Sequence, residues 1–227
     1  VASADYNGDG WVDIYVANDG TDNLLWINQQ DGTFRNTALL SGVAVSGLGV
    51  TEASMGVDAG DFDNDGDEDL FMTHLTREGN NLYVNDGAGM FQDASVQSGL
   101  GVGSMAYTGW GTTWFDYDNY GWLDVLTVNG TITARDTSSD QPFPYDQRKT
   151  LFRTLQNGRF GDVTAEAGRV VALSESGRGA AFGDIDNDGD MDVLVGNDGG
   201  PLRLLINQLN GRRHWLGLRL VDGNGRD

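Results

Sequence analysis

The sequence predicts an all-β fold in which four-stranded antiparallel units follow one another along the chain. An aspartate-rich pattern of nine residues occurs four times, starting at residues 5, 61, 116 and 184, so that the spacings are 56, 55 and 68 residues. A short apolar run follows each copy, and no segment shows a sustained helical period. Repeats of this length are typical of β-propeller blades, and we expect about four of them here.

Each repeat is expected to supply its strands in the same order. An innermost strand precedes the aspartate-rich pattern, although the first repeat lacks most of it. Consecutive apolar residues after the pattern, such as Val193 and Leu194, indicate a strand buried on both faces. Glycine-containing hairpin turns closed by Phe34, Phe91 and Phe160 lead into an outer strand and a turn of small residues. The two middle strands are expected at residues 12–18 and 23–28, 70–75 and 81–85, 123–129 and 150–155, and 193–197 and 202–207.

Two repeats depart from this order. In the third, the link between the middle strands lengthens to residues 130–149, which hold two of the three prolines and the only lysine. Loops of this length are uncommon without a role, so this one is the candidate surface for a partner, on the face opposite the aspartate-rich loops. In the fourth, residues 210–215 lack the Gly-x-Phe turn. Four units could close a small propeller, but units of 55 residues or more are long for that, and with the short first repeat this predicts part of a larger ring of about seven blades.

The aspartate-rich pattern has the spacing of a calcium-binding loop. Oxygen-bearing side chains recur at positions one, three, five and nine, a glycine at position six allows a sharp turn, and position seven can offer its carbonyl oxygen. Such ligand sets suit a hard divalent cation, above all Ca²⁺. The predicted metal ligands are Asp5, Asn7, Asp9, Trp11 and Asp13; Asp61, Asp63, Asp65, Asp67 and Asp69; Asp116, Asp118, Trp122 and Asp124; and Asp184, Asp186, Asp188, Asp190 and Asp192.

The four loops are not equivalent. Loops 61–69 and 184–192 carry all four carboxylates, whereas the first loop has Asn7, which keeps an oxygen but lacks a charge. The third loop has Tyr120 at position five, where a water molecule would have to fill the gap. We therefore expect about three to four structural calcium ions. Plain polar turns are the alternative, since Asp and Gly favour turns anyway. A helix-loop-helix calcium hand fits poorly, because both flanks here are strands.

The charge distribution agrees with a cation-binding protein. The net charge is -20, and 14 of the 34 acidic residues are the aspartates at positions one, three, five and nine, so four divalent ions would bring the charge to -20 + 8 = -12. With only 14 basic residues, the chain is a poor partner for nucleic acid. The chain has no cysteine, and neither a signal segment nor a run of apolar residues long enough to span a membrane is visible. Because loops of this kind fill at the calcium concentrations found outside the cytosol, we expect a secreted, cell-surface or periplasmic location.

These repeats resemble the calcium-binding FG-GAP/VCBS repeats of β-propellers, whose Asp-x-Asp-x-Asp-Gly-x-x-Asp loops lie between the first two strands of a blade. Four stretches resemble more narrowly the ASPIC/UnbV group of proteins related to cartilage acidic protein: FDYDNYGWLDVLTVNG, PYDQRKTLFR, RGAAFGDIDNDGDMDVLVGN and the terminal HWLGLRLVDGNGRD. The resemblance implies propeller blades over residues 1–212 and the start of a truncated ASPIC/UnbV-like domain over residues 213–227. It implies a fold and a metal more firmly than an activity.

Catalysis has little support in the sequence. The tight carboxylate clusters are accounted for by metal-ligand spacing, and His74 is better explained as a packed or capping residue than as a general base. No Gly-x-Ser-x-Gly elbow or phosphate-binding loop is present. Tryptophans such as Trp11 and Trp122 could stack on sugars, although packing between blades is their commoner role. The favoured hypothesis is a calcium-stabilised, non-enzymatic extracellular propeller that serves as a binding or scaffold module for protein or glycan partners. The alternatives are the propeller part of a secreted polysaccharide lyase or hydrolase whose catalytic residues lie elsewhere, and a docking subunit of a larger extracellular assembly.

Overall fold

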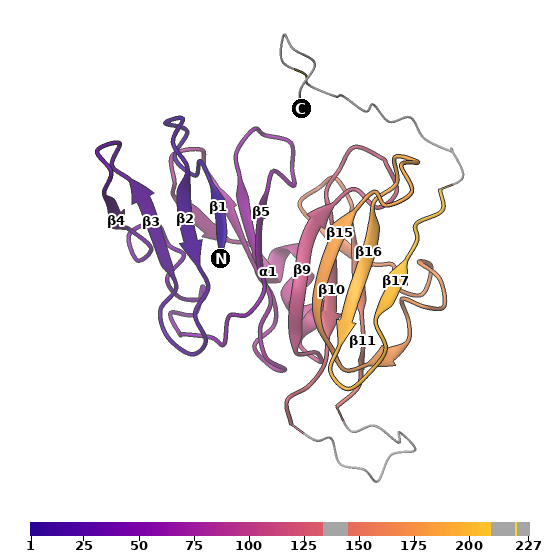
Figure 1. Cartoon of the computed structure of the whole chain (residues 1–227). Helices are drawn as coiled ribbons and strands as arrows, with labels where there is room; N and C mark the ends of the chain where they lie inside the picture. Colours follow the sequence, from indigo (N-terminus) through magenta and orange to yellow (C-terminus); the bar gives the residue numbers. More distant parts are fainter. Residues whose placement is uncertain (134–144, 210–220, 222–227) are drawn as a thin grey trace.

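The computed structural model describes residues 1–133, 145–209 and 221, and within them the regular secondary structure is almost entirely β-strand. Four antiparallel sheets follow one another along the sequence, as the repeat predicts (Figure 1). The first two sheets consist of β1 (Ala2–Ala4), β2 (Asp13–Val16), β3 (Leu24–Asn28) and β4 (Phe34–Asn36), and of β5 (Val57–Gly60), β6 (Asp69–Met72), β7 (Asn81–Asn85) and β8 (Phe91–Asp93). The other two consist of β9 (Gly109–Phe115), β10 (Asp124–Asn129), β12 (Thr150–Thr154) and β13 (Phe160–Asp162), and of β15 (Gly177–Gly183), β16 (Asp192–Asn197) and β17 (Arg203–Leu205).

The sheets have the arrangement of propeller blades. Within each sheet, strands that are neighbours in the repeat are also hydrogen-bonded neighbours, so every sheet is an up-and-down meander. The first strands of successive sheets pack against one another, with β5 contacting β1 and β9, and β9 contacting β15. Figure 1 shows the sheets side by side from β4 to β17. Each blade therefore has its first strand innermost, and the predicted fold class is confirmed.

Three of the strands end at least two residues earlier than the sequence suggested. β2 ends at Val16, β6 at Met72 and β17 at Leu205, where the pattern indicated residues 18, 75 and 207. Beyond β6, the backbone N–H of Thr73 still donates to the carbonyl oxygen of Gly56. The buried Thr73 hydroxyl accepts the N–H of Gly56 at 2.9 Å and donates to the carbonyl oxygen of Trp110 at 2.9 Å. This side chain links the second and third sheets just beyond the end of β6.

The turn expected after the outer strand of the second sheet is helical. Residues 95–104 form two short helices, α1 (Ser95–Ser98) and α2 (Leu100–Ser104), which are separated by Gly99 at a φ of 88°. The buried Ser104 hydroxyl donates to the carbonyl oxygen of Leu100, and Leu100 packs in the core. Serine and glycine allow this tight link, which is too short to produce a helical period in the sequence.

Three apolar clusters fill the spaces between consecutive sheets. Alternate residues of β6 pack into two of these clusters, because Leu70 and Met72 contact the first sheet while Phe71 contacts the third. The second cluster is aromatic, and the rings of Phe62 and Trp114 stack with centroids 5.7 Å apart and planes 13° from parallel. Burial of these side chains in close contact holds neighbouring blades together.

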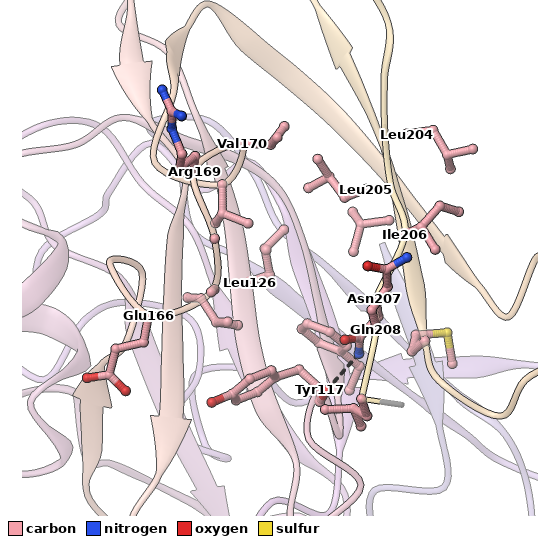
Figure 2. Close-up of a pocket in the computed structure, with 18 residues that line it drawn as sticks. Tyr117, Leu126, Glu166, Arg169, Val170, Leu204, Leu205, Ile206, Asn207 and Gln208 are labelled. Atoms are coloured by element: carbon pink, nitrogen blue, oxygen red, sulfur yellow. Dashed lines mark hydrogen bonds between the residues drawn. The ribbon is translucent and has the colours of Figure 1, made fainter. Parts of the chain in front are cut away.

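The third interface, between the third and fourth sheets, retains a cavity of about 510 Å³. Leu126 of β10 and Leu205 of β17 line it from opposite sheets (Figure 2). Asn207 borders it and donates a hydrogen bond from Nδ2 to the carbonyl oxygen of Tyr117 at 2.7 Å. The chain beyond residue 209 lies outside the described residues except for Val221, so the domain boundary expected near residue 213 is a prediction.

The aspartate-rich loops and the long link lie at opposite ends of the sheets. Each loop joins the first and second strands of its sheet, whereas residues 130–133 and 145–149 lie at the far end of β10 and β12. There β11 (Gln147–Arg148) pairs with β14 (Ser174–Glu175). The buried Lys149 forms an ion pair with Glu175 at 2.9 Å, and Arg203 reaches the same carboxylate at 2.7 Å. Residues 134–144 of the predicted contact loop lie outside the described part of the chain.

Candidate metal centre

The four Asp loops, at residues 5–13, 61–69, 116–124 and 184–192, share one backbone design. In the second loop, the two carboxylate oxygens of Asp61 accept hydrogen bonds from the N–H groups of Asp65 and Gly66, both at 3.0 Å. Gly66 has a φ of 99°, a region that residues with a side chain rarely adopt, which explains the glycine at position six. The same pair of bonds to position one recurs at Asp5, Asp116 and Asp184.

The aspartate at position nine is buried and joins three parts of the blade. Asp69 is 1% exposed, and it accepts the N–H of Phe62 in the loop at 3.3 Å and the N–H of Asn85 at the end of β7 at 2.9 Å. Its own backbone begins β6, so a single carboxylate fixes the loop between two strands. The equivalent residues Asp13, Asp124 and Asp192 each accept two backbone N–H groups in the same way.

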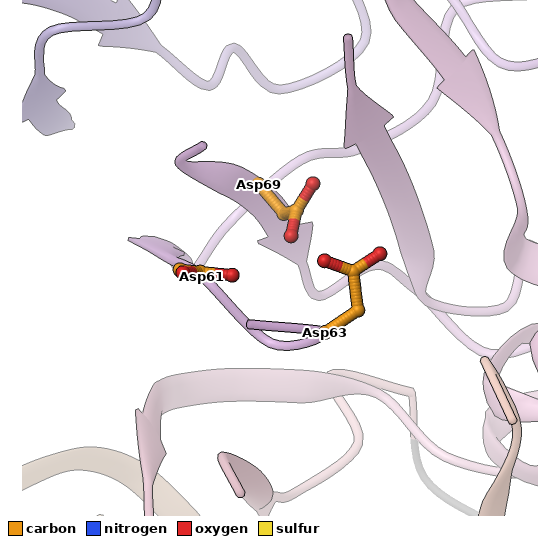
Figure 3. A group of neighbouring side chains, drawn as sticks. All are labelled: Asp61, Asp63 and Asp69. Carbon is orange, nitrogen blue, oxygen red and sulfur yellow. The ribbon is translucent and has the colours of Figure 1, made fainter. Parts of the chain in front are cut away.

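Three of the loops bring carboxylates together. In each trio, the closest oxygens of positions one, three and nine lie within 4.8 Å of one another, as Figure 3 shows for Asp61, Asp63 and Asp69. In the first loop Asn7 stands at position three, and its Oδ1 accepts the N–H of Asp9 at 3.1 Å. The other two trios are Asp116, Asp118 and Asp124, and Asp184, Asp186 and Asp192.

Positions five and seven are arranged differently from the trios. The position-five aspartates Asp9, Asp65 and Asp188 each accept the N–H of position seven. At position seven, the ring of Trp11 is exposed, and Asp190 is buried, where its carboxylate accepts hydrogen bonds from Asn119 and from the N–H of Leu209. Carbonyl ligation by Trp11, Asp67, Trp122 and Asp190 stays a prediction.

The buried carboxylates are held in unfavourable surroundings. Burial raises the pKa of Asp69 to about 8 and that of Asp124 to about 7, although their backbone hydrogen bonds act in the opposite direction. Burial, and then the charges of Asp65 and Asp61, also raise the pKa of Asp63. Its Oδ1 atom is buried and makes no hydrogen bond to any residue that the structure describes. A divalent cation would favour the ionised forms and give this oxygen a partner, so the residues fit a hard cation with oxygen ligands.

Comparison with protein families matches FG-GAP-like repeats to residues 5–72, 61–127 and 143–195, which is more than half of the 227 residues. The chain belongs to the FG-GAP-like repeat family. The first match contains the loops that start at residues 5 and 61, the second contains those that start at 61 and 116, and the third contains the loop that starts at 184. The closer resemblance to VCBS repeats and to ASPIC/UnbV proteins stays an expectation.

Among solved structures, the FG-GAP chain is similar to a lectin from Agrocybe aegerita that was studied for its recognition of non-reducing terminal N-acetylglucosamine. The two are 19% identical, with a TM-score of 0.46, and the alignment covers 91% of this chain and 52% of the lectin. The FG-GAP chain thus spans about half the length of that protein. No curated protein sequence matches the chain significantly.

An arginine side chain places a positive charge beside the third FG-GAP loop. Arg153 of β12 places Nη2 2.7 Å from Oδ2 of Asp118, which is position three of this loop. The guanidinium also lies over the ring of Tyr120, 5.5 Å from its centre. The sequence analysis missed Arg153, because the arginine lies 29 residues beyond the end of its loop. The sequence did contain a signal for it, because the other three repeats have an aliphatic residue at the position equivalent to Arg153.

Neighbouring FG-GAP loops are fastened together by asparagines at position four. Asn64 donates from Nδ2 to the carbonyl oxygen of Gly121 in the third loop at 3.3 Å, and Asn119 donates to that of Gly189 in the fourth loop at 3.2 Å. The first loop has Gly8 at this position and so has no amide to donate. The recurrence of asparagine at position four was visible in the sequence, but its role required the blade arrangement.

A cleft of about 720 Å³ lies on the FG-GAP blades at the end opposite the Asp loops. Glu52 and Asn81 line it together with apolar side chains such as Val50 and Met105. Burial raises the pKa of Glu52 to about 7, although its hydrogen bond from Asn81 at 2.7 Å acts in the opposite direction. Behind it, His74 is buried, as the sequence predicted for a packed residue, and burial lowers its pKa to about 4. Among the described residues, no helix is long and apolar enough to cross a membrane.

Proposed function

We propose that this chain is a calcium-stabilised binding or scaffold module that works outside the cytosol and contacts protein or glycan partners. The observation that carries the proposal is the convergence of three carboxylates in each of three loops, with a buried oxygen on Asp63 that has no hydrogen-bond partner among the described residues. Oxygen ligands at this density favour calcium over softer metals. A location with abundant free calcium follows from the same chemistry.

Calcium would act by stabilising each blade. The carboxylate at position nine already holds the Asp loop to the second and third strands through backbone hydrogen bonds. An ion would remove the mutual repulsion of the carboxylates at positions one, three and nine, and so favour the folded blade over the unfolded chain. Its role is structural, and the buried state of His74 supports a non-catalytic function for the described residues.

Partner contacts are best placed at the end of the blades opposite the Asp loops. The cleft there offers a carboxylate, an amide and apolar groups side by side, a mixture suited to a protein or sugar surface. The long link 130–149 leaves the third sheet at the same end, which supports its assignment as a second contact region. Because the metal loops are distant from this end, calcium would support binding through the fold.

Thermal unfolding in excess calcium and in chelator tests the calcium proposal directly. We expect calcium to raise the unfolding midpoint, because a ligand at 100 times its dissociation constant stabilises the folded state by about 2.7 kcal/mol per site. An equal midpoint in the two conditions would contradict it. Partner binding is tested separately, by screening glycans and extracellular proteins with the chain and with a Glu52→Gln variant. Loss of binding in the variant at an unchanged midpoint would support the cleft.

A further inference from the structure

Arg153 brings a permanent positive charge to the third Asp loop. Its Nη2 lies 2.7 Å from Oδ2 of Asp118, a carboxylate that is only 17% exposed. A guanidinium group remains protonated at all physiological pH values, and its fork of donors matches a carboxylate. The position-three carboxylate of this loop is therefore already paired with a cation that belongs to the protein.

The equivalent carboxylate of the second loop is in the opposite situation. Asp63 also occupies position three, yet its Oδ1 is buried and has no hydrogen-bond partner in the part of the chain that the structure describes. One loop thus lacks a positive charge at position three, while the other contains one.

The arginine occurs only beside the loop that has lost a ligand. In each sheet, the position equivalent to Arg153 directly precedes the residue whose backbone N–H donates a hydrogen bond to the buried aspartate at position nine. In chain order, these residues are Ile27, Val84, Arg153 and Ile206. The side chains at position five, in the same order, are Asp9, Asp65, Tyr120 and Asp188. Tyrosine thus replaces the carboxylate in the same blade in which arginine replaces the aliphatic side chain, and the two side chains contact each other.

We propose that the guanidinium of Arg153 takes the place of the metal ion in the third loop, so that the chain binds three calcium ions, in loops 5–13, 61–69 and 184–192. This inference rests on the proposed calcium-stabilised function and specifies which loops serve it. A calcium ion at the third loop would have to displace Arg153 from Asp118 or tolerate its charge nearby, with one carboxylate fewer than the second and fourth loops offer. The third loop would then keep its folded conformation at any calcium concentration.

Counting bound calcium by equilibrium dialysis or native mass spectrometry tests the inference. We expect three ions on the wild-type chain. Two position-three variants form a matched pair: Asp118→Asn should leave the count at three, whereas Asp63→Asn should lower it to two or weaken one site at least tenfold. The double variant Arg153→Ile/Tyr120→Asp, which copies the other blades, should bind a fourth ion. The reverse exchange, Val84→Arg/Asp65→Tyr, should lower the count to two.

Circular dichroism should accompany each count to establish that the variant is folded. If the first double variant does not fold, Arg153→Met keeps the packing of the side-chain stem and should still raise the third loop's affinity for calcium. Four ions on the wild-type chain, or the loss of an ion in Asp118→Asn, would overturn this inference while leaving the proposed function intact. A folded wild-type chain that binds no calcium would overturn both.

Discussion

The side-chain amide of Asn119 donates hydrogen bonds to the carbonyl oxygen of Gly189 at 3.2 Å and to Oδ1 of Asp190 at 2.9 Å. One asparagine thus fastens the third Asp loop to the fourth, across the boundary between two blades. The backbone of Asn119 has a φ of 52°, a left-handed conformation that asparagine tolerates better than most residues. The residue therefore serves both the shape of its own loop and the position of the next.

Replacing Asn119 by alanine should separate these roles. Asn187 occupies the same position of the fourth loop at a φ of 60°, but the described residues give its side chain no hydrogen-bond partner, so Asn187→Ala is the matched control for backbone strain. We expect Asn119→Ala to destabilise the chain by about 1 kcal/mol more than the control, as measured by urea unfolding. Equal losses in the two variants would show that the link between the loops contributes nothing.

The dependence of stability on pH should differ with and without calcium. The folded-state pKa values of Asp69 and Asp124, about 8 and 7, lie above the value of about 3.9 for an unfolded aspartate. Between these values the folded state binds more protons than the unfolded state, so the free energy of unfolding should fall as the pH rises from about 4 to 8 in chelator. Saturating calcium, which binds the ionised Asp69, should remove the part of the fall that Asp69 causes, whereas the part that Asp124 causes, in the loop that contains Arg153, should remain. Urea unfolding from pH 5 to 8 measures both profiles, and parallel profiles would argue against the metal centre.

Asp63 should have opposite effects on the calcium-free and calcium-bound protein. Asp63→Asn removes a poorly solvated charge whose pKa is raised by burial and by neighbouring aspartates. In chelator we expect the variant to be at least as stable as the wild type, by about 0 to 1 kcal/mol. In calcium it should be the less stable of the two, because a charged ligand is missing. A variant that is less stable by the same amount in both conditions would indicate a purely structural role.

The tryptophans should fall into two classes. Trp114 packs between the second and third sheets against Phe62 and Phe71, so Trp114→Ala should cost about 3–5 kcal/mol. Trp11 is 48% exposed, and Trp11→Ala should change the free energy of unfolding by no more than about 0.5 kcal/mol. Thermal and urea unfolding compare the two. A large loss for Trp11 would mean that its ring packs against something outside the described residues.

Much of the fold could be predicted because the repeat marks it directly. The spacing of Asp61 from Asp116 gives the blade length, and the final aspartate of each loop gives the start of a strand buried on both faces. The trio of positions one, three and nine also follows from the pattern, since the hairpin brings both ends of the loop together. These features depend on residues that are close in sequence.

The features that sequence reasoning missed depend on contacts between distant segments. Arg153 reaches Asp118 only because β12 lies beside β10, and Asn119 reaches Gly189 only because two blades pack side by side. The helices at residues 95–104 were missed for another reason: each is too short to show a period. Ligation by the aspartates at position five stays a prediction, and the structure adds that each of them accepts the backbone N–H of position seven.

The two hydrogen bonds of Asp69 have a consequence for the order of folding. One comes from Phe62 in the loop and the other from Asn85 at the end of β7, so the carboxylate is fully oriented only after the third strand of the blade has paired. An isolated hairpin of β5 and β6 would hold this ligand loosely and bind an ion poorly. Metal uptake would therefore select the completed blade over partly assembled intermediates, and would act as a checkpoint on folding.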